Sequence, residues 1–390
     1  MSREFDIAVF GASGFTGKLV AEYLAGRADS RPPRRLALAG RDREKLVAVR
    51  AQTGLPENTP LVCADSGDLS SLADLARRSR VVLTTVGPYQ TYGSPLVAAC
   101  AAAGTHYVDL CGETAWMRAM IDAHEAQAKA SGARIVFSCG FDSVPFDFGV
   151  AYLQAEARRR LSAPCPRVKG RVRKMKGTFS GGTAASFRAT LAAAVKDPAV
   201  RDLLRDPFAL TPGFVGPKQP SGAKPEYDEA LGAWAAPFIM AAINTRNVHR
   251  SNYLLGHPYG ADFVYDEMIL TGPGEKGEQA ARATAAGLND MAGDSGPKAG
   301  EGPSREARES GFYDLLFVGE GRNGERLAAS VKGDRDPGYG STCKMISECA
   351  ILLTETDGHG GIFTPVAAFG VDFTQRLASR AGLSFAIEQE

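Results

Sequence analysis

Short apolar runs alternate with longer helix-like stretches over the first third of the chain. The runs predict strands at residues 7–10, 35–39, 60–64, 81–86, 106–110 and 134–137. Helix-like stretches lie between and after them, at residues 18–24, 69–77, 96–103, 117–130 and 148–161. Regular alternation of strand and helix is typical of a doubly wound parallel sheet with right-handed connections. We therefore predict an α/β fold with an N-terminal Rossmann domain.

The pattern changes beyond about residue 165. An alternating stretch at 167–176 predicts a strand, and two further strands flank Asn323-Gly324, a pair that favours a tight hairpin turn. Helices are expected at residues 184–196, 280–291, 341–354 and 365–378, and a loop at 293–304. We predict three parts: a Rossmann domain at 1–147, an α+β domain with a mixed or antiparallel sheet for substrate binding or oligomerisation at 148–340, and C-terminal helices that pack back on the first domain at 341–390.

A glycine-rich segment follows the first strand and opens the first helix. It has the spacing G-x-x-G-x-x-G and consists of Gly11, Ala12, Ser13, Gly14, Phe15, Thr16 and Gly17. We expect Gly11 to allow a sharp turn, Gly14 a close approach of backbone to pyrophosphate, and Gly17 tight packing of helix on strand. The free N–H groups at the helix start would then face the phosphates. The segment predicts a dinucleotide-binding turn.

The end of the second strand indicates which dinucleotide is bound. An NAD-specific Rossmann fold usually places an acidic residue there for the ribose 2′-OH, whereas here Arg41 follows the strand and Lys45 is close by. A guanidinium suits a 2′-phosphate, so we expect NADP(H), with Asp42 serving an unphosphorylated ribose as the alternative. Asp65 and Ser66 end the third strand. Asp65 would either accept from the adenine amino group or cap the next helix.

Residues after the later strands are candidates for the reactive end of the cofactor. A Gly-Pro turn at the carboxyl end of a parallel strand lines the ligand crevice, which adds Val86, Gly87, Pro88 and Tyr89 to the predicted cofactor site. A phenol could donate a proton or wall in the cofactor, and the neighbouring carboxylates could raise one another's pKa or cap helices. Our catalytic candidates are Tyr89, Tyr92 and Asp142. Asp109, Glu113 and Asp147 are the other carboxylates considered, and Glu113 could instead pair with Arg118 or with a base of the second domain.

Composition narrows the function classes. The chain has 390 residues, 44% of them hydrophobic and 23% charged, with a net charge of +1, which gives no reason to expect a nucleic-acid partner. Its seven cysteines form no CxxC pair, and with no His/Cys/Asp cluster we predict reduced thiols and no metal. The first strand begins near Met1 and no apolar run is long enough to span a bilayer. We expect a cytoplasmic protein.

Five segments, spread over most of the chain, resemble a known family. They are VFGASGFTGK at 9–18, VGPY at 86–89, YVDLCGE at 107–113, GFDSVPFD at 140–147 and GIFTPVAAFG at 361–370. The chain is similar to the saccharopine dehydrogenase-like oxidoreductases, most closely to the branch of trans-acting enoyl reductases. That resemblance implies a Rossmann domain with a second α/β domain and use of NADP(H). It also implies reduction of a carrier-bound acyl group in phthiocerol-type lipid synthesis, and some members of the wider family are described as membrane- or lipid-droplet-associated.

Three functions are compatible with these features. The first is NADPH-dependent reduction of an α,β-unsaturated acyl thioester, on a small-molecule or carrier-bound substrate. The second is a saccharopine-type reaction on an amino-acid imine or secondary amine, whose carboxylates would need bases such as Arg188, Arg246 or Arg250. The third is a non-catalytic NADP(H)-binding regulator of lipid metabolism. Peripheral membrane contact and a homodimer stay open.

Two segments of the second half bear on the substrate. Arg167, Lys169, Arg171 and Arg173 would share one face of a strand. Such a face is usually solvated, but it could instead dock an acidic carrier domain or the phosphates of a pantetheine arm. The apolar stretch at 234–243 is either buried core or a cover over an acyl chain.

Overall fold

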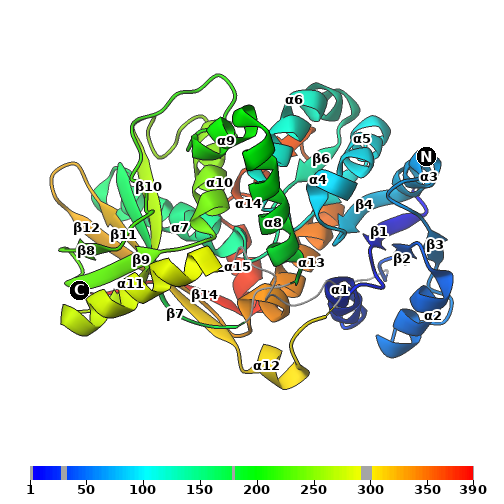
Figure 1. The fold of residues 1–390 in the computed structure, drawn as a ribbon. Coiled ribbons are helices and arrows are strands. Elements are labelled where there is room, and N and C mark those ends of the chain that lie inside the picture. The colour runs from blue at the N-terminus through cyan, green and yellow to red at the C-terminus, as the bar shows by residue number, and fades with distance from the viewer. Residues whose placement is uncertain (1–2, 28–32, 178–180, 291–300, 390) are drawn as a thin grey trace.

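The computed structural model describes residues 3–27, 33–177, 181–290 and 301–389, which form two sheets flanked by helices. Figure 1 shows the blue and cyan N-terminal part on one side and the second sheet, with its green, yellow and orange strands, on the other. The orange and red C-terminal helices lie in the middle of this view. The chain therefore returns to its first half after building the second sheet.

The first sheet has seven strands in the order β13-β6-β5-β4-β1-β2-β3, and all neighbours are parallel. The strands are β1 (Phe5–Phe10), β2 (Leu36–Gly40), β3 (Leu61–Cys63), β4 (Ser79–Thr84), β5 (His106–Val108), β6 (Arg134–Val136) and β13 (Gly361–Phe363). Side chains such as Ile7, Val82 and Ile135 are fully buried, as expected when helices cover both faces of a parallel sheet. The predicted Rossmann sheet is confirmed.

Helices connect these strands, and polar caps begin several of them. They are α1 (Phe15–Ala25), α2 (Arg43–Gln52), α3 (Leu69–Arg78), α4 (Tyr89–Tyr92), α5 (Ser94–Ala103), α6 (Thr114–Ser131) and α7 (Val144–Leu161). Asp42 caps α2 by accepting from the backbone N–H of Lys45. The cap of α3 is Asp68, which accepts from Ser70 and Ser71, so the alternative that Asp65 caps this helix is wrong. Asp65 instead accepts from the N–H of Gly67 at 2.7 Å.

The second sheet is mixed, in the order β14-β12-β11-β7-β10-β9-β8, and its one parallel pair is β7 with β10. Its strands are β7 (Arg167–Lys176), β8 (Glu226–Asp228), β9 (Ala233–Pro237), β10 (Val264–Gly272), β11 (Phe312–Glu320), β12 (Arg326–Gly333) and β14 (Leu383–Ile387). The predicted hairpin is β11–β12, which pairs from Tyr313 opposite Gly333 to Glu320 opposite Arg326. α7 packs against this hairpin, where Gly149 leaves space for the ring of Phe317.

The remaining helices lie around the second sheet and between the two sheets. They are α8 (Gly181–Lys196), α9 (Pro198–Arg205), α10 (Ala241–Leu254), α11 (Gly274–Asp290), α12 (Arg305–Glu309), α13 (Thr342–Glu355), α14 (Pro365–Phe369) and α15 (Phe373–Arg376), with π-helical turns at Pro337–Ser341 and Leu377–Ala381. Most of the loop expected at 293–304 lies outside the described residues. The single helix expected at 365–378 is wrong, because the chain turns at Gly370, which has φ +71°.

The C-terminal segment ties the two sheets together. α13 packs against α1, β4 and β5 of the first half. β13 then extends the first sheet beside β6, and β14 extends the second sheet beside β12. A short strand, β13, together with helix α13, therefore carries the return of the chain to its first half.

Candidate active site

The glycine turn joins β1 to α1 with little room for side chains. Gly11 has φ +85°, in the left-handed region, and a Cβ there would lie 2.7 Å from Cγ2 of Val86. A Cβ on Gly17 would collide with the carbonyl oxygen of Gly11. Gly14 is the N-cap of α1, so the free N–H groups and the positive dipole end of the helix lie at the turn. The conformational roles predicted for Gly11 and Gly17 are confirmed, and the turn fits a pyrophosphate.

The side chains of the turn divide between core and cavity. Ala12 is buried, whereas Ser13 is exposed. Phe15 and Thr16 line the cavity described below, and the ring of Phe15 makes an edge contact with Tyr339 at 4.8 Å between centroids. This contact brings the chain after the second sheet against the start of α1.

The basic residues after β2 lie at the surface beside the end of β3. Arg41 is exposed, and its Nε lies 3.7 Å from Oδ2 of Asp65. Ser66, next along the chain, is half-buried, and the Nζ of Lys45 lies 3.4 Å from the carboxylate of Asp42. The structure thus brings Arg41 and Asp65 together at neighbouring strand ends. Exposed pairs of this kind are weak, so the guanidinium is free to turn toward a ligand.

A cavity of about 420 Å³ extends from the glycine turn toward the second sheet. Thr85, Gly87 and Tyr89, which follow β4, line it beside Phe15 and Thr16 of α1. Val86 touches Gly11 rather than the cavity, and Pro88 begins α4 as its N-cap. The lining also includes an apolar wall from α8, α9, the turn before α10 and the start of α10, which consists of Phe187, Leu191, Leu204, Phe238, Ile239, Met240 and Ile243.

The two tyrosines predicted as proton donors differ in their surroundings. Tyr89 is buried, its hydroxyl donates to the carbonyl oxygen of Thr84 at 3.4 Å, and it accepts from the N–H of Leu110 at 3.0 Å. Burial, with Asp109 nearby, raises the pKa of Tyr89 well above its usual value. Tyr92 is exposed and is not among the residues that line the cavity. The structure therefore favours a role for Tyr89 in lining the cavity over a role as the proton donor.

Glu113 joins the turn after β4 to a helix of the second half. Its carboxylate accepts from the N–H groups of Tyr89 at 2.8 Å and Gln90 at 2.7 Å, and from Oγ of Ser186 in α8 at 2.6 Å. The expected pairing with Arg118 is wrong, since Arg118 binds Asp122 one helical turn away. Glu113 is buried at the edge of the cavity, where it fixes the start of α4.

Asp142 is the predicted carboxylate that reaches the cavity without a hydrogen-bond partner among the described residues. Burial raises its pKa to about 7. Asp109 and Asp147 also have pKa values raised to about 7 by burial, but both are held internally. Asp109 accepts from Tyr107, Cys111 and Ser138, and Asp147 accepts from Ser251 and Val366. Only Asp142 of these three lines the cavity.

Helix α10 and strand β10 supply polar groups at the site, of which the sequence analysis named Arg246 and Arg250 but not Glu267. Glu267 accepts from Tyr265 at 2.8 Å and Asn244 at 2.9 Å, and burial raises its pKa to about 8, with the charge of Asp142 contributing. Arg246 lines the cavity, whereas Arg250 donates to two backbone carbonyls elsewhere. The usual signal for a helix is an apolar residue at every third or fourth position, and α10 lacks it because Asn, Arg and His residues occupy many of its positions.

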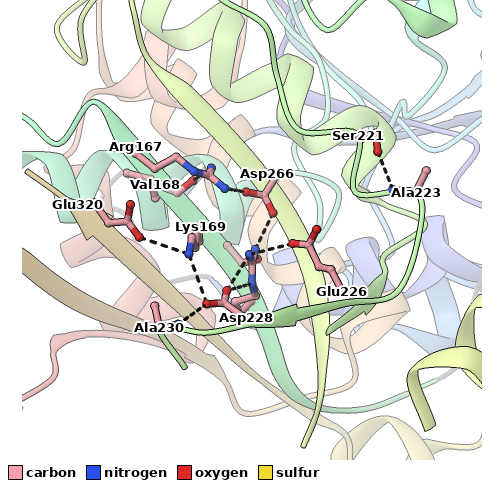
Figure 2. A network of polar contacts seen from close by, with 12 residues as sticks. Arg167, Val168, Lys169, Ser221, Ala223, Glu226, Asp228, Ala230, Asp266 and Glu320 are labelled. Atoms are coloured by element: carbon pink, nitrogen blue, oxygen red, sulfur yellow. Dashed lines mark hydrogen bonds and ion pairs between the residues drawn. The ribbon is translucent and has the colours of Figure 1, made fainter. Parts of the chain in front are cut away.

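The basic face expected on β7 is occupied by ion pairs. Figure 2 shows Arg167 and Lys169 directed at Asp266, Asp228 and Glu320 of neighbouring segments. Arg171, two residues beyond Lys169 on the same strand, is fully buried, with Asp228 at 3.1 Å and Asp266 at 2.8 Å.

Arg173, farther along β7, pairs with Asp314 and Glu388. The hypothesis that these four bases dock a carrier domain or a pantetheine phosphate assumed unpaired bases, and all four are paired instead. Their charge is used within the second sheet.

Fold and site together define a dinucleotide-dependent oxidoreductase with an apolar substrate cavity. A family model described as the saccharopine dehydrogenase NADP binding domain matches residues 7–136. A Mycobacterium tuberculosis protein provisionally named a trans-acting enoyl reductase is 41% identical over 98% of this chain and 97% of its own. A trans-acting enoyl reductase of Mycobacterium ulcerans is 36% identical over 96% of each chain. The chain belongs to the saccharopine dehydrogenase-like family, in the trans-acting enoyl reductase branch, and is an NADP-dependent oxidoreductase.

A solved structure supports the same architecture. Saccharopine dehydrogenase (L-Glu forming) from Saccharomyces cerevisiae aligns over 99% of this chain and 100% of its own, with a TM-score of 0.58 and 11% sequence identity. At that identity the likeness concerns the fold alone. Within the described ranges, no helix is long and apolar enough to cross a bilayer, and His, Cys, Asp and Glu side chains form no cluster suited to a metal ion.

Proposed function

We propose that this protein reduces an α,β-unsaturated acyl thioester with NADPH. The observation that carries the proposal is the lining of one cavity, which combines Phe15 and Thr16 of the glycine turn, Asp142, and a group of apolar side chains from the second half of the chain. Its size and lining suit a lipophilic acyl group beside a dinucleotide. The names of the mycobacterial relatives agree with an acyl substrate.

Residues of the first half hold the cofactor in this proposal. The pyrophosphate lies at the turn formed by Gly11–Gly17, with Arg41 and Lys45 at the 2′-phosphate and Asp65 and Ser66 toward the adenosine. Gly87, Pro88 and Tyr89, with Val86 behind them, wall the nicotinamide end. NADPH supplies the hydride for the β-carbon of the substrate, and the protein positions both partners.

Asp142 supplies the proton in this proposal. Reduction leaves the α-carbon in need of a proton, and a carboxyl with a pKa of about 7 is protonated in half of the molecules at neutral pH. Burial is the cause of that raised pKa, and the charge of an ionised Asp142 in turn contributes to the raised pKa of Glu267, because like charges disfavour ionisation. The apolar side chains Phe238, Ile239 and Met240 exclude water from the acyl chain.

A saccharopine-type reaction is the second candidate, and one observation favours it. Arg246 lines the cavity and could hold a substrate carboxylate. Arg250, considered for the same task, donates to the carbonyl oxygens of Leu210 and Ile362 and does not line the cavity. A single base in an apolar cavity suits an amino-acid substrate with several carboxylates less well than it suits a thioester.

The test is NADPH oxidation with a matched set of substrates. We would compare 2-enoyl pantetheine thioesters of increasing chain length with their saturated analogues, a ketone, and an imine formed from an amino acid and a keto acid. The proposal expects turnover of the enoyl thioesters, with kcat/KM rising with chain length. Turnover of the imine alone would establish the second candidate. NADPH binding without turnover of any compound would indicate a non-catalytic regulator.

A further inference from the structure

Arg246 is a buried cation at the cavity with unused donors. Only 8% of the surface of Arg246 is exposed to solvent. Nη1 donates to the carbonyl oxygen of Ala242 at 2.5 Å, Nη2 donates to that of Leu204, and Nε has no partner. A guanidinium carries five N–H groups, so three of them are free of these two bonds. Arg246 is also the one Lys or Arg among the described residues that line the cavity.

Among the described residues, no carboxylate lies within ion-pair distance of Arg246, and the charge of Asp206 acts on it only from farther away. Burial lowers its pKa to about 10, so the guanidinium remains protonated at neutral pH. Among the described residues it makes no ion pair within 4.0 Å, whereas Arg250, which is also buried, has Glu125 at 3.7 Å. A buried charge that lacks a partner is costly, and folding retains it here beside an apolar wall. A ligand that brings negative charge to this position would therefore gain a strong interaction.

We propose that Arg246 binds the thioester oxygen of the substrate and stabilises the negative charge that forms on it during reduction. The inference rests on the proposed function and adds the group that this function lacked. As the β-carbon gains the hydride, the electron pair of the C=C bond moves to form a bond between the α-carbon and the carbonyl carbon. The carbonyl π pair then becomes a lone pair on the oxygen, which is an enolate.

The reaction is completed by the carboxyl of Asp142. Its proton passes to the α-carbon, the carbonyl double bond re-forms, and the charge leaves the oxygen that Arg246 holds. The ionised Asp142 then takes a proton from water. A cation placed in a desolvated cavity favours this sequence, because it interacts more strongly with the enolate oxygen than with the neutral carbonyl.

Variants of Arg246 separate this role from a structural one. We expect Arg246→Gln to lower kcat for an enoyl thioester by about 10²–10³-fold with little change in KM, which is the usual effect of removing an oxyanion donor. Arg246→Lys keeps the charge and should recover at least about tenfold of that loss. The matched control is Arg205→Gln, which removes an exposed cation beside Leu204 and should leave kcat unchanged. Equal Kd values for NADPH in all four proteins would show that the cofactor site is intact.

A second readout does not depend on turnover. An acetoacetyl pantetheine thioester ionises to an enolate that absorbs in the near ultraviolet, and it can be bound in the presence of NADP⁺. The wild type should lower the pH at which the enolate appears, and Arg246→Gln should abolish that shift while Arg246→Lys retains part of it. These results would support the inference even if Arg246→Gln were too unstable for kinetics, since Arg246→Lys could still be measured.

The outcomes are distinguishable. If none of the enoyl thioesters supports NADPH oxidation by the wild type, the proposed function is contradicted. An active wild type with an equally active Arg246→Gln, or with a change in KM alone, overturns the role of Arg246 and leaves the proposed function standing. An enolate spectrum that is the same in the wild type and in Arg246→Gln overturns it as well.

Discussion

The carboxyl of Asp142 changes its protonation state near neutral pH, because burial raises its pKa to about 7. If the protonated form delivers the proton, kcat should be level below pH 7 and fall about tenfold for each unit above it. Asp142→Asn should lower kcat by about 10²–10⁴-fold and remove this dependence. The measurement is a pH profile of kcat for both proteins. A wild-type profile that rises above pH 7 would show that the ionised form is the active one.

The same carboxyl gives a check that needs no substrate. A raised pKa means that the folded state binds this proton more tightly than the unfolded state, in which the pKa is near 3.8. Stability from this proton is fully present below that value and is lost as pH rises to about 7. Asp142→Asn does not titrate. Its Tm should therefore rise relative to the wild type between these two pH values and stay level above them.

Arg41 carries the expected preference for NADP(H). Arg41→Asp should weaken NADPH binding at least about tenfold more than NADH binding, since a hydrogen bond to a charged group contributes about 1.5–3 kcal/mol. The measurement is the Kd of each nucleotide by fluorescence. Arg43→Asp makes the same change of charge two residues along and should alter the ratio much less. Equal losses of NADPH and NADH in Arg41→Asp would place the 2′-phosphate elsewhere.

At the residue scale, the sequence predicted the features that depend only on residues contiguous in the chain. The conformations of Gly11 and Gly17 follow from a strand, a turn and a helix that are contiguous in the chain. Arg246 was one of three bases considered for a substrate carboxylate and could not be singled out, and Glu267 was not considered, because neither stands in a motif. Only the fold places Arg246 in the lining of the cavity and brings Glu267 close enough to Asp142 for their charges to interact.

Among the elements, the contact of α1 with the glycine turn depends on the absence of a side chain at position 17. Gly17→Ala would push its Cβ into the carbonyl oxygen of Gly11, and overpacking of this kind costs about 1–3 kcal/mol. NADPH binding should weaken as the helix N-terminus moves. The matched control is Gly287→Ala in α11, where a Cβ meets no atom within 4 Å. That variant should be neutral or more stable by up to about 1 kcal/mol in urea denaturation.

The strand β7 depends on its buried ion pairs. Burial would raise the pKa of Asp228, but Arg171 and Lys169 hold it below its usual value. Arg171→Met would leave Asp228 and Asp266 with one base each, and breaking such a buried network costs about 3–5 kcal/mol. Urea denaturation would measure the loss. Lys174→Met, on the exposed end of the same strand, should change stability by less than about 0.5 kcal/mol, and an equal loss in both would contradict this account.

The elements that the pattern predicted are those with a long or regular apolar repeat. β1, β4 and α7 were expected because their buried positions are nearly continuous or recur at helical spacing. β13 is three residues long, too short to show a period, and it joins the first sheet from more than 200 residues beyond β6. A pairing so distant in sequence leaves no local signal, so the end of the chain was expected to be helical.

At the scale of the whole molecule, we expect the C-terminal segment to make the two sheets unfold together. In the sequence, α13 and β13 come between β12 and β14 of the second sheet, but in space they pack with the first half. Buried contacts also cross the boundary: Oγ of Ser251 donates to Asp147 at 2.7 Å, and Arg250 donates to the carbonyl oxygen of Ile362 at 2.6 Å. Unfolding one sheet alone would break these contacts, and the sheet that stays folded would form no contacts in their place.

The two tryptophans of the chain test this expectation, because one lies in each half. Trp116, in α6, is 5.5 Å from Tyr89 between ring centroids, and Trp234, in β9, is 5.8 Å from Tyr227. Trp116→Phe and Trp234→Phe each leave a single fluorophore. If the two sheets unfold together, fluorescence and circular dichroism should give the same urea midpoint for the wild type. For each variant, the midpoint from its remaining tryptophan should likewise equal the midpoint from its circular dichroism.

Truncation makes the coupling visible from one end. A chain that stops at Ala381 lacks β14 and leaves β12 as a sheet edge, and it loses the pair between Arg173 and Glu388. If the sheets unfold together, this deletion in the second sheet should lower the midpoint reported by Trp116 as much as the midpoint reported by Trp234. A loss seen by Trp234 while Trp116 keeps its midpoint would mean that the first sheet is stable by itself, with β13 and α13 still attached to it.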